Sequence, residues 1–231
     1  VEVTKQLIKD LVLMNAEQWA FAIKFSRIYY AENAAVACAL TSLEGVDAAT
    51  QDAALKKVSV KGRTQIIPEA LPVACMVIDY AHNAFSSECV LKMLREYHPN
   101  RLIALFGCGG NRAAARRVGM GEVAGRIADL SVITMDNPRF ESMEDINKGI
   151  IEGIEKNHGK YLCINDRKEA IRYVMDHAEP GDIVALLGKG HETYQEIEGK
   201  RYDFSEEEVI LEWLREKQKG TPVSGLDLGI F

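Results

Sequence analysis

The sequence predicts an α/β fold in which helices cover both faces of a mostly parallel sheet. The first observation is a rhythm: from position 73 onward, short apolar runs alternate with amphipathic stretches of roughly 10 to 15 residues. The second is that runs such as 73–80 and 182–188 are apolar almost throughout, which is typical of strands buried on both faces. Both observations indicate βαβ units, in which each parallel strand is followed by a crossover helix.

The elements from residue 73 onward follow from these patterns in chain order. Together they predict a Rossmann-like fold with helices on both faces of the sheet. The predicted strands are 73–80, 101–107, 130–134, 160–165 and 182–188, and the predicted helices are 84–97, 119–128, 142–156 and 167–178.

Past the last of these strands the alternation stops. Residues 193–204 predict a small hairpin that turns near Glu198 and Gly199, and residues 205–217 predict a helix. Ser205 is placed to cap this helix, and the acids that follow it suit the positive end of the helix dipole.

The first 65 residues predict a different arrangement. Residues 10–25 predict two strands around a turn, and residues 30–45 and 47–58 predict helices. This stretch has too little apolar sequence to form a convincing core alone, so we expect it to be part of a larger domain. The predicted division is an incomplete portion at 1–65, a complete domain at 66–216 and a tail at 217–231.

Composition excludes several classes of protein. The net charge is -6 with both signs well mixed, which argues against a general nucleic-acid binder. No apolar run approaches the length of a membrane span, and the first residues have no signal-peptide pattern, so we expect a cytoplasmic protein. The odd number and scattered positions of the cysteines predict free thiols and no structural zinc site. They are Cys38, Cys75, Cys89, Cys108 and Cys163.

Four unusual polar stretches follow predicted strands. Ligands of doubly wound sheets bind beyond the carboxyl ends of the strands, so these stretches predict one shared site. Each alone has a plainer explanation, because glycine and Asx-proline turns are common and a lone histidine is more often structural. The stretches are "DYAHN" (79–83), "GCGGNR" (107–112), "DNPR" (136–139) and "GKGHE" (188–192).

In this order and at this spacing, the four stretches resemble the C-terminal domain of the Mur ligases. "NAAVACA" (33–39) and "VKGRTQ" (60–65) add to the resemblance, which covers roughly residues 26 to 214. It implies an ATP-dependent acid–amino-acid ligase of peptidoglycan synthesis that uses ATP and Mg²⁺. ATP would phosphorylate a carboxylate of UDP-N-acetylmuramoyl-L-alanyl-D-glutamate, and the amine of a diamino acid would attack the acyl phosphate. Residues 1–65 would then be a partial remnant of the family's α/β central ATPase domain.

The resemblance also implies which residues bind the diamino acid. Arg139 would take the distal carboxylate of meso-diaminopimelate through its guanidinium fork, and Arg112 would hold another carboxylate of that ligand. Glu192 would take the distal ammonium with the Gly188 carbonyl, and Asn137 would offer an amide donor and acceptor. L-Lysine lacks the distal carboxylate, so Arg139 favours diaminopimelate. We expect Arg139 to be partly open to solvent rather than sealed in a buried ion pair.

On the nucleotide side, the resemblance places Asn33 near the adenine and Arg63 near the phosphates. Asp79 and His82 would lie near the ribose and phosphates as catalytic and ATP-binding residues. The plainer alternatives are an exposed helix position for Asn33 and a strand-end cap for Asp79. Asp136 is expected to shape its loop by accepting from backbone N–H groups.

Several family features are missing. No Gly-Lys-Ser/Thr phosphate loop occurs, and the magnesium-binding positions and the UDP-binding domain are absent too. We therefore expect part of a longer ligase, inactive alone. Departures near the nucleotide side include Gln65, Asn83, Asn111 and Ala113. They leave open a relative that adds lysine or another amino acid, and a non-catalytic amino-acid-binding module.

Overall fold

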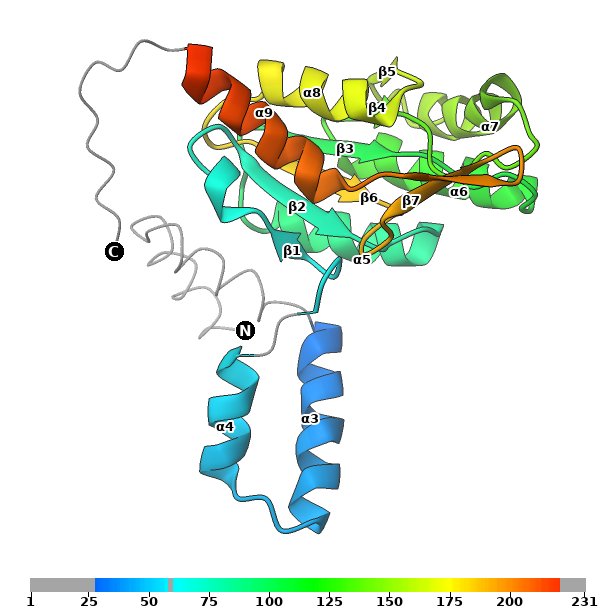
Figure 1. Cartoon of the computed structure of the whole chain (residues 1–231). Coiled ribbons are helices and arrows are strands. Elements are labelled where there is room, and N and C mark those ends of the chain that lie inside the picture. The colour runs from blue at the N-terminus through cyan, green and yellow to red at the C-terminus, as the bar shows by residue number, and fades with distance from the viewer. Residues whose placement is uncertain (1–27, 58–59, 221–231) are drawn as a thin grey trace.

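The computed structural model describes residues 28–57 and 60–220, without the side chains of residues 28–33, 56, 219 and 220. Its main body is a six-stranded sheet with the strand order β1-β2-β6-β3-β4-β5 (Figure 1). Strands β2 to β6 run parallel, and β1 pairs antiparallel with β2 at one edge. The strands are β1 (Gln65–Ile66), β2 (Cys75–Asp79), β3 (Leu102–Phe106), β4 (Leu130–Ile133), β5 (Tyr161–Cys163) and β6 (Ile183–Leu187).

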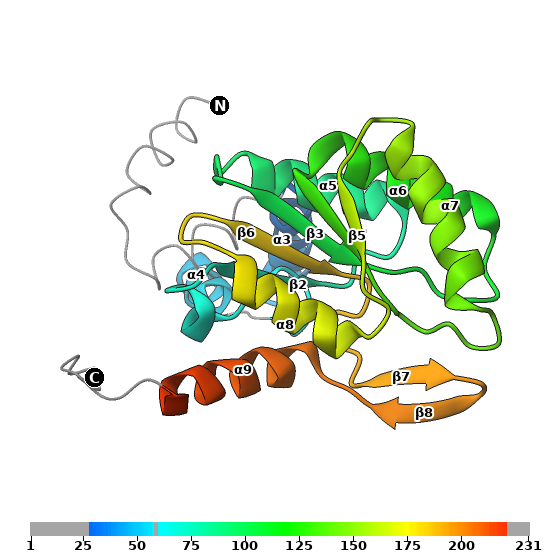
Figure 2. The ribbon, with the colours of Figure 1, turned by 90° about the horizontal axis from the view of Figure 1, so that it is seen from above.

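Helices cover both faces of this sheet, as predicted (Figure 2). One face packs against α5 (Ala84–Arg95), α6 (Ala114–Ile127) and α7 (Met143–Glu155). The other face packs against α8 (Arg167–His177), α9 (Glu206–Gly220) and the short 3₁₀ helix η1 (Pro68–Ala70). All residues of β2, β3 and β6 are buried, because these central strands have helices on both sides.

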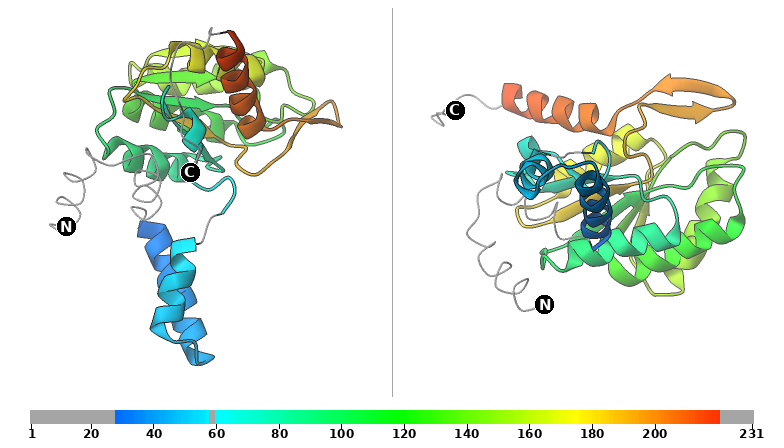
Figure 3. Two further views of the ribbon diagram at one scale, coloured as in Figure 1. Left: turned by 60° about the vertical axis from the view of Figure 1, so that its left-hand side comes forward. Right: turned by 90° about the horizontal axis from the view of Figure 1, so that it is seen from below.

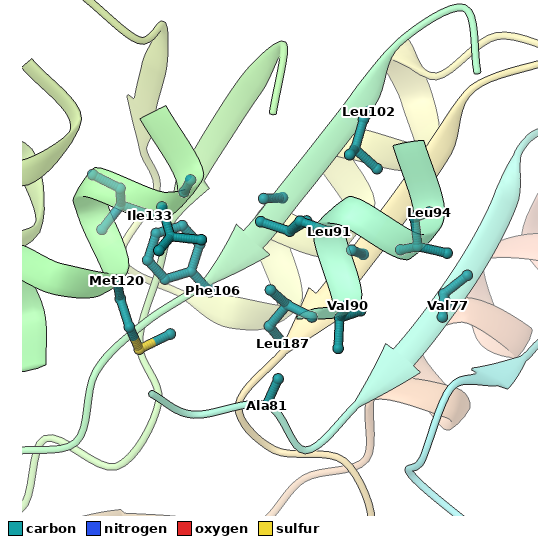
Figure 4. Packing of buried hydrophobic residues seen from close by; sticks show 14 of the residues in the cluster. Val77, Ala81, Val90, Leu91, Leu94, Leu102, Phe106, Met120, Ile133 and Leu187 are labelled. Atoms are coloured by element: carbon teal, nitrogen blue, oxygen red, sulfur yellow. The ribbon is translucent and has the colours of Figure 1, made fainter. Parts of the chain in front are cut away.

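The strands divide their side chains between two cores. Because successive side chains point to opposite faces, Val77 and Phe106 face α5 and α6, whereas Met76 and Leu105 face the α8 side. Figure 4 shows the first core, where Phe106 lies close to Met120 of α6. Burial of this apolar surface is the main source of stability of the domain.

Two predicted boundaries move in the structure. Helix α6 begins at Ala114 rather than residue 119, and β5 is three residues long rather than spanning 160–165. Helices α6 and α7 pack so closely that a Cβ on Gly121 would lie 2.1 Å from the Ile150 carbonyl oxygen. The glycines that lower the helix propensity of this stretch are therefore needed for packing between the two helices.

The C-terminal elements form as predicted. Strands β7 (Tyr194–Ile197) and β8 (Lys200–Asp203) make a separate two-stranded hairpin. The Ser205 hydroxyl accepts a hydrogen bond from the Glu208 N–H at 3.3 Å, so the predicted cap is present. Helix α9 continues to Gly220, past the predicted start of the tail at 217.

Two helices precede the sheet domain, as predicted. They are α3 (Ile28–Leu43) and α4 (Ala48–Lys57), and they form a hairpin that projects from the body (Figures 1 and 3). Val36, Leu40 and Leu43 of α3 are exposed at helical spacing. The predicted strands in 10–25 and residues 221–231 of the predicted tail lie outside the described residues, and the predicted boundary at 65/66 falls within β1. None of the described helices has the length and apolar content that a membrane crossing requires.

Candidate functional site

The four polar stretches meet in one pocket at the carboxyl edge of the sheet. Its volume is about 120 Å³, well below the 300–1,000 Å³ of pockets for drug-sized ligands, so it suits one small polar group. Parallel neighbouring strands bring their following loops together here. The lining residues are Tyr80, His82, Gly107, Cys108, Gly109, Arg112, Arg116, Asp136, Asn137, Arg139, Gly188 and Glu192.

A buried lysine lies beneath this pocket. The Lys189 side chain is fully buried, and its ammonium lies 3.2 Å from Glu192 Oε2 and 3.5 Å from Asp136 Oδ1. Asp136 therefore pairs with Lys189 rather than with backbone N–H groups, which corrects the expectation for this residue. Sequence reasoning missed Lys189, although its position between two strand-end glycines of "GKGHE" was a usable signal.

The Asn137 side chain is already engaged at both ends. Its amide nitrogen donates to Glu192 Oε2 at 2.9 Å, and its oxygen accepts from the Glu196 N–H at 2.9 Å. The residue is buried but lines the pocket, and one donor and one acceptor of its amide are used within the protein. Through these bonds Asn137 orients Glu192 and holds the β7–β8 hairpin against its own loop.

Arg139 is neither sealed nor free. Its side chain is 23% exposed, and its Nε lies 3.4 Å from Oε2 of Glu196, which is 25% exposed. The expectation of a partly open arginine agrees with this exposure, but a partner carboxylate is present. Arg139 has a left-handed backbone with φ 54°. Its N–H donates to the Glu196 carbonyl, and its own carbonyl accepts from the Glu198 N–H, which holds this conformation against the hairpin.

The other cations of the pocket come from the glycine loop and from α6. Arg112 is exposed, and Arg116 is half-buried. The loop is held by Glu141, which accepts from the Asn111 N–H and pairs with Arg117. The Arg117 hydrogen bond, followed by that of Asn111, lowers the pKa of Glu141. Together with Arg139, Arg112 and Arg116 give the pocket three cationic lining side chains.

The residues assigned to the nucleotide side lie in different surroundings. Asp79 is buried and does not line the pocket. Its carboxylate accepts from the Thr64 N–H at 2.7 Å and from the Ala81 N–H at 2.9 Å, the geometry of the strand-end alternative. His82 lines the pocket, and its Nδ1 lies 2.9 Å from the Tyr80 carbonyl.

Aromatic and cationic groups border this side of the pocket. The Arg63 guanidinium lies 4.6 Å from the centre of the Tyr80 ring. Burial, followed by the negative charge of Glu192, raises the pKa of the Tyr80 phenol. Burial also raises the pKa of Cys108 to about 12, so this thiol in the pocket wall stays protonated and is no nucleophile. The side chain of Asn33 lies outside the described part of the chain.

A second buried ion pair supports the edge of the sheet from below. Arg167 is fully buried and binds Glu206 Oε1 through Nη2 at 2.7 Å and through Nε at 3.0 Å. It also donates to the Leu187 carbonyl at 2.9 Å and to the Met135 carbonyl at 3.2 Å. Arg167 thus joins the ends of β4 and β6 to the start of α9. Sequence reasoning missed this residue too.

The described residues do not by themselves fit a magnesium nucleotide. Among residues 28–57 and 60–220 no group of three or more His, Cys, Asp or Glu side chains could hold a metal ion. Arg63, Tyr80 and His82 offer a cation and rings beside the pocket, but the Asp79 carboxylate is turned to the backbone. The pocket can therefore bind a small charged group, and no step through a nucleotide is assigned to it.

Comparisons with known proteins agree with this architecture. A family model described as Mur ligase, glutamate ligase domain, matches residues 62–190. A UDP-N-acetylmuramoyl-L-alanyl-D-glutamate–2,6-diaminopimelate ligase of Caldanaerobacter subterraneus is 37% identical over 212 residues, which are 92% of this chain and 44% of the relative. The enzyme of that name from Aquifex aeolicus is 37% identical over 88% of this chain and 42% of its own length.

A solved structure gives the same result. The structure of a ligase of that name superimposes with a TM-score of 0.65 at 35% identity, covering 83% of this chain and 39% of that one. The chain thus spans less than half the length of the relatives it matches.

Proposed function

Because the chain belongs to the Mur ligase family, we propose that it is part of an ATP-dependent ligase that adds meso-diaminopimelate to UDP-N-acetylmuramoyl-L-alanyl-D-glutamate. Within that ligase, the pocket at the carboxyl edge of the sheet binds the far amino-acid end of the diamino acid. The observation that carries the proposal is the presence of Arg139 and Glu192 in the walls of one small polar pocket.

The charges of the pocket match such an end group. An amino-acid head carries one carboxylate and one ammonium close together, so it needs a cation and an anion in one cavity. Arg112, Arg116 and Arg139 supply donors for the carboxylate. Lys189 lies between Asp136 and Glu192, so one buried cation faces two carboxylates and one negative charge is left for the ammonium.

The pocket also accounts for selection of diaminopimelate over lysine. The two ligands differ at the distal carbon, where only diaminopimelate has a carboxylate. When lysine binds, the arginine of the site forms no charge-assisted pair with the ligand, and the complex lacks that contribution to its affinity. Holding the far end fixes the direction of the reacting amine and brings it into position for attack.

The nucleotide chemistry is assigned outside the described residues. ATP and Mg²⁺ would activate the acceptor carboxylate as an acyl phosphate when bound. This pocket contributes orientation of the attacking amine and exclusion of diamines that lack the second carboxylate. His82 and Arg63 border it on the side that we assign to the acyl phosphate.

Titration calorimetry of the 231-residue chain tests this proposal. Meso-diaminopimelate should bind and L-lysine should bind much more weakly. Arg139→Ala should weaken diaminopimelate on the order of a hundredfold, because a bidentate charge-assisted pair is lost. Arg139→Lys should recover only part, since an ammonium cannot form the fork. Arg126→Ala is the matched control, because Arg126 lies on α6 outside the pocket and pairs with Glu88. Equal binding of lysine and diaminopimelate would contradict the proposal.

A further inference from the structure

The Nη1 group of the Arg139 guanidinium is already committed within the protein. Its Nη1 donates to the Gly110 carbonyl at 3.0 Å and reaches the Asn137 carbonyl at 3.5 Å. Among the described residues, its Nη2 has no hydrogen-bond partner. A carboxylate binds an arginine through two adjacent N–H groups that point the same way. With both hydrogens of Nη1 directed at loop carbonyls, the remaining bidentate face is formed by Nε and Nη2.

Glu196 stands at one half of that face. Its Oε2 lies 3.4 Å from Nε, longer than the roughly 2.7–2.9 Å of a charge-assisted hydrogen bond. Both side chains are about one quarter exposed, so water screens the pair and its net strength is small. A ligand carboxylate that takes Nε and Nη2 together competes with the Glu196 carboxylate for Nε.

Glu196 has a second cation within its own hairpin. In the β7–β8 register Glu196 lies directly opposite Arg201, and directly paired residues project from the same face of a two-stranded sheet. Arg201 now lies over the Tyr194 ring, with 4.4 Å from its guanidinium carbon to the ring centre. A Glu196 carboxylate released from Arg139 therefore has an alternative cationic neighbour one strand away.

We propose that Glu196 is a built-in counter-ion of Arg139 that the distal carboxylate of the ligand displaces. Glu196 thereby lowers the affinity of this pocket for ligands that carry the distal carboxylate, and the inference rests on the function proposed above. A diamine without the distal carboxylate cannot replace Glu196, so the Arg139–Glu196 pair stays in place and the affinity for that diamine does not depend on it. A ligand with that carboxylate exchanges a loose, screened ion pair for a bidentate one.

The backbone of Glu196 has a separate task, which allows the side chain to be tested alone. Its N–H donates to Asn137 Oδ1 at 2.9 Å, and its carbonyl accepts from the Arg139 N–H at 3.1 Å. Both bonds hold the hairpin to the "DNPR" loop without using the carboxylate. Replacing Glu196 by glutamine therefore removes the charge and leaves the scaffold of the loop in place.

The experiment is titration calorimetry of wild type, Glu196→Gln, Glu198→Gln, Arg139→Ala and the Arg139→Ala/Glu196→Gln double variant with meso-diaminopimelate and L-lysine. Glu196→Gln should bind diaminopimelate about two- to fivefold more tightly, the strength of a partly exposed ion pair, and should leave lysine unchanged. Glu198→Gln makes the same chemical change at the exposed turn of the hairpin and should change nothing. In the Arg139→Ala background the gain should vanish, because the displaced pair no longer exists.

Each outcome decides the inference. Suppose that wild type binds diaminopimelate and Arg139→Ala loses this binding, but Glu196→Gln binds the ligand more weakly than wild type or equally well. This result overturns the counter-ion role of Glu196, while the proposed function stands. A gain that persists in the double variant, or that appears equally for lysine, also overturns it, because it would not act through Arg139. Failure of the wild-type chain to bind diaminopimelate overturns the proposed function and this inference together. Glu196→Ala, which also removes the carboxylate, should repeat the gain.

Discussion

Two arginine–carboxylate pairs lie near the same edge of the sheet, and they differ in almost every physical respect. Arg167 and Glu206 are 0% and 1% exposed, with contacts of 2.7 and 3.0 Å. Arg139 and Glu196 are 23% and 25% exposed and lie 3.4 Å apart. Arg167 also binds two strand-end carbonyls, whereas Arg139 keeps an open donor at the pocket wall.

The difference separates a structural pair from an exchangeable one. Arg167 and Glu206 have no water to replace a lost partner, so removal of either leaves an uncompensated charge in the interior. Arg139 and Glu196 are screened and loosely joined, so another carboxylate can take the place of Glu196 at little cost. The same pair of residue types therefore holds the end of the sheet at one position and, in the function we propose, receives a ligand at the other.

The largest effect on stability is expected when the buried Arg167–Glu206 pair is broken. Arg167→Met should lower the free energy of unfolding by about 3–5 kcal/mol, because Glu206 stays buried without its counter-ion. Urea unfolding followed by circular dichroism measures it. Arg172→Met is the matched control, since Arg172 lies on the same helix and pairs with Glu216 at the surface, where about 1 kcal/mol or less is expected. Similar losses in the two variants would remove the distinction between the pairs.

A smaller effect is expected when the open pair is broken. Arg139→Ala should lower the free energy of unfolding by only about 1 kcal/mol, from one hydrogen bond to Gly110 and one screened ion pair. The same urea experiment compares it directly with Arg167→Met. A loss as large as that of Arg167→Met would mean that Arg139 is a structural residue, and that its exposure has been misinterpreted as readiness for a ligand.

The smallest expected effect is a dependence of stability on pH. Hydrogen bonds from Arg117 and from the Asn111 N–H lower the pKa of Glu141 below its ordinary value of 4.5. A lowered folded-state pKa contributes stability that is present above pH 4.5 and is lost as the pH falls through the folded-state value. Glu141→Gln should therefore make urea midpoints fall less steeply between pH 6 and pH 3 than in wild type. An unchanged slope would show that Glu141 contributes nothing to acid sensitivity.

Local patterns were sufficient to predict the elements of the domain. The apolar runs of β2, β3 and β6 and the helical spacing of α5, α7 and α8 are properties of neighbouring residues, so they can be interpreted without knowing the fold. The sequence also predicted that the four polar stretches converge, because parallel strands place their carboxyl ends at one edge of the sheet. The start of α6 was missed, since Ala113 at its N-cap position makes no side-chain capping bond and no Ser, Thr, Asp or Asn marks the first turn.

The pairing of charges at the site was not predictable in this way. Asp136 was expected to bind backbone N–H groups, because nothing in the "DNPR" stretch shows that Lys189 lies beneath it. The bond from Asn137 to Glu192 was not predicted for the same reason. Arg139 meets Glu196 only because the β7–β8 hairpin folds back onto the loop. These partners are distant in the sequence, and their distances depend on how three separate segments pack.

The amino-acid order by itself determined an α/β sheet with polar stretches at its strand ends, because hydrophobic period and motif spacing act over short stretches of chain. Only the tertiary structure decided which acid neutralises which cation, and which pair is sealed from water. The physical reason is that the strength of an ion pair depends on burial and on the distance between the charges, and both are set by packing between remote parts of the molecule.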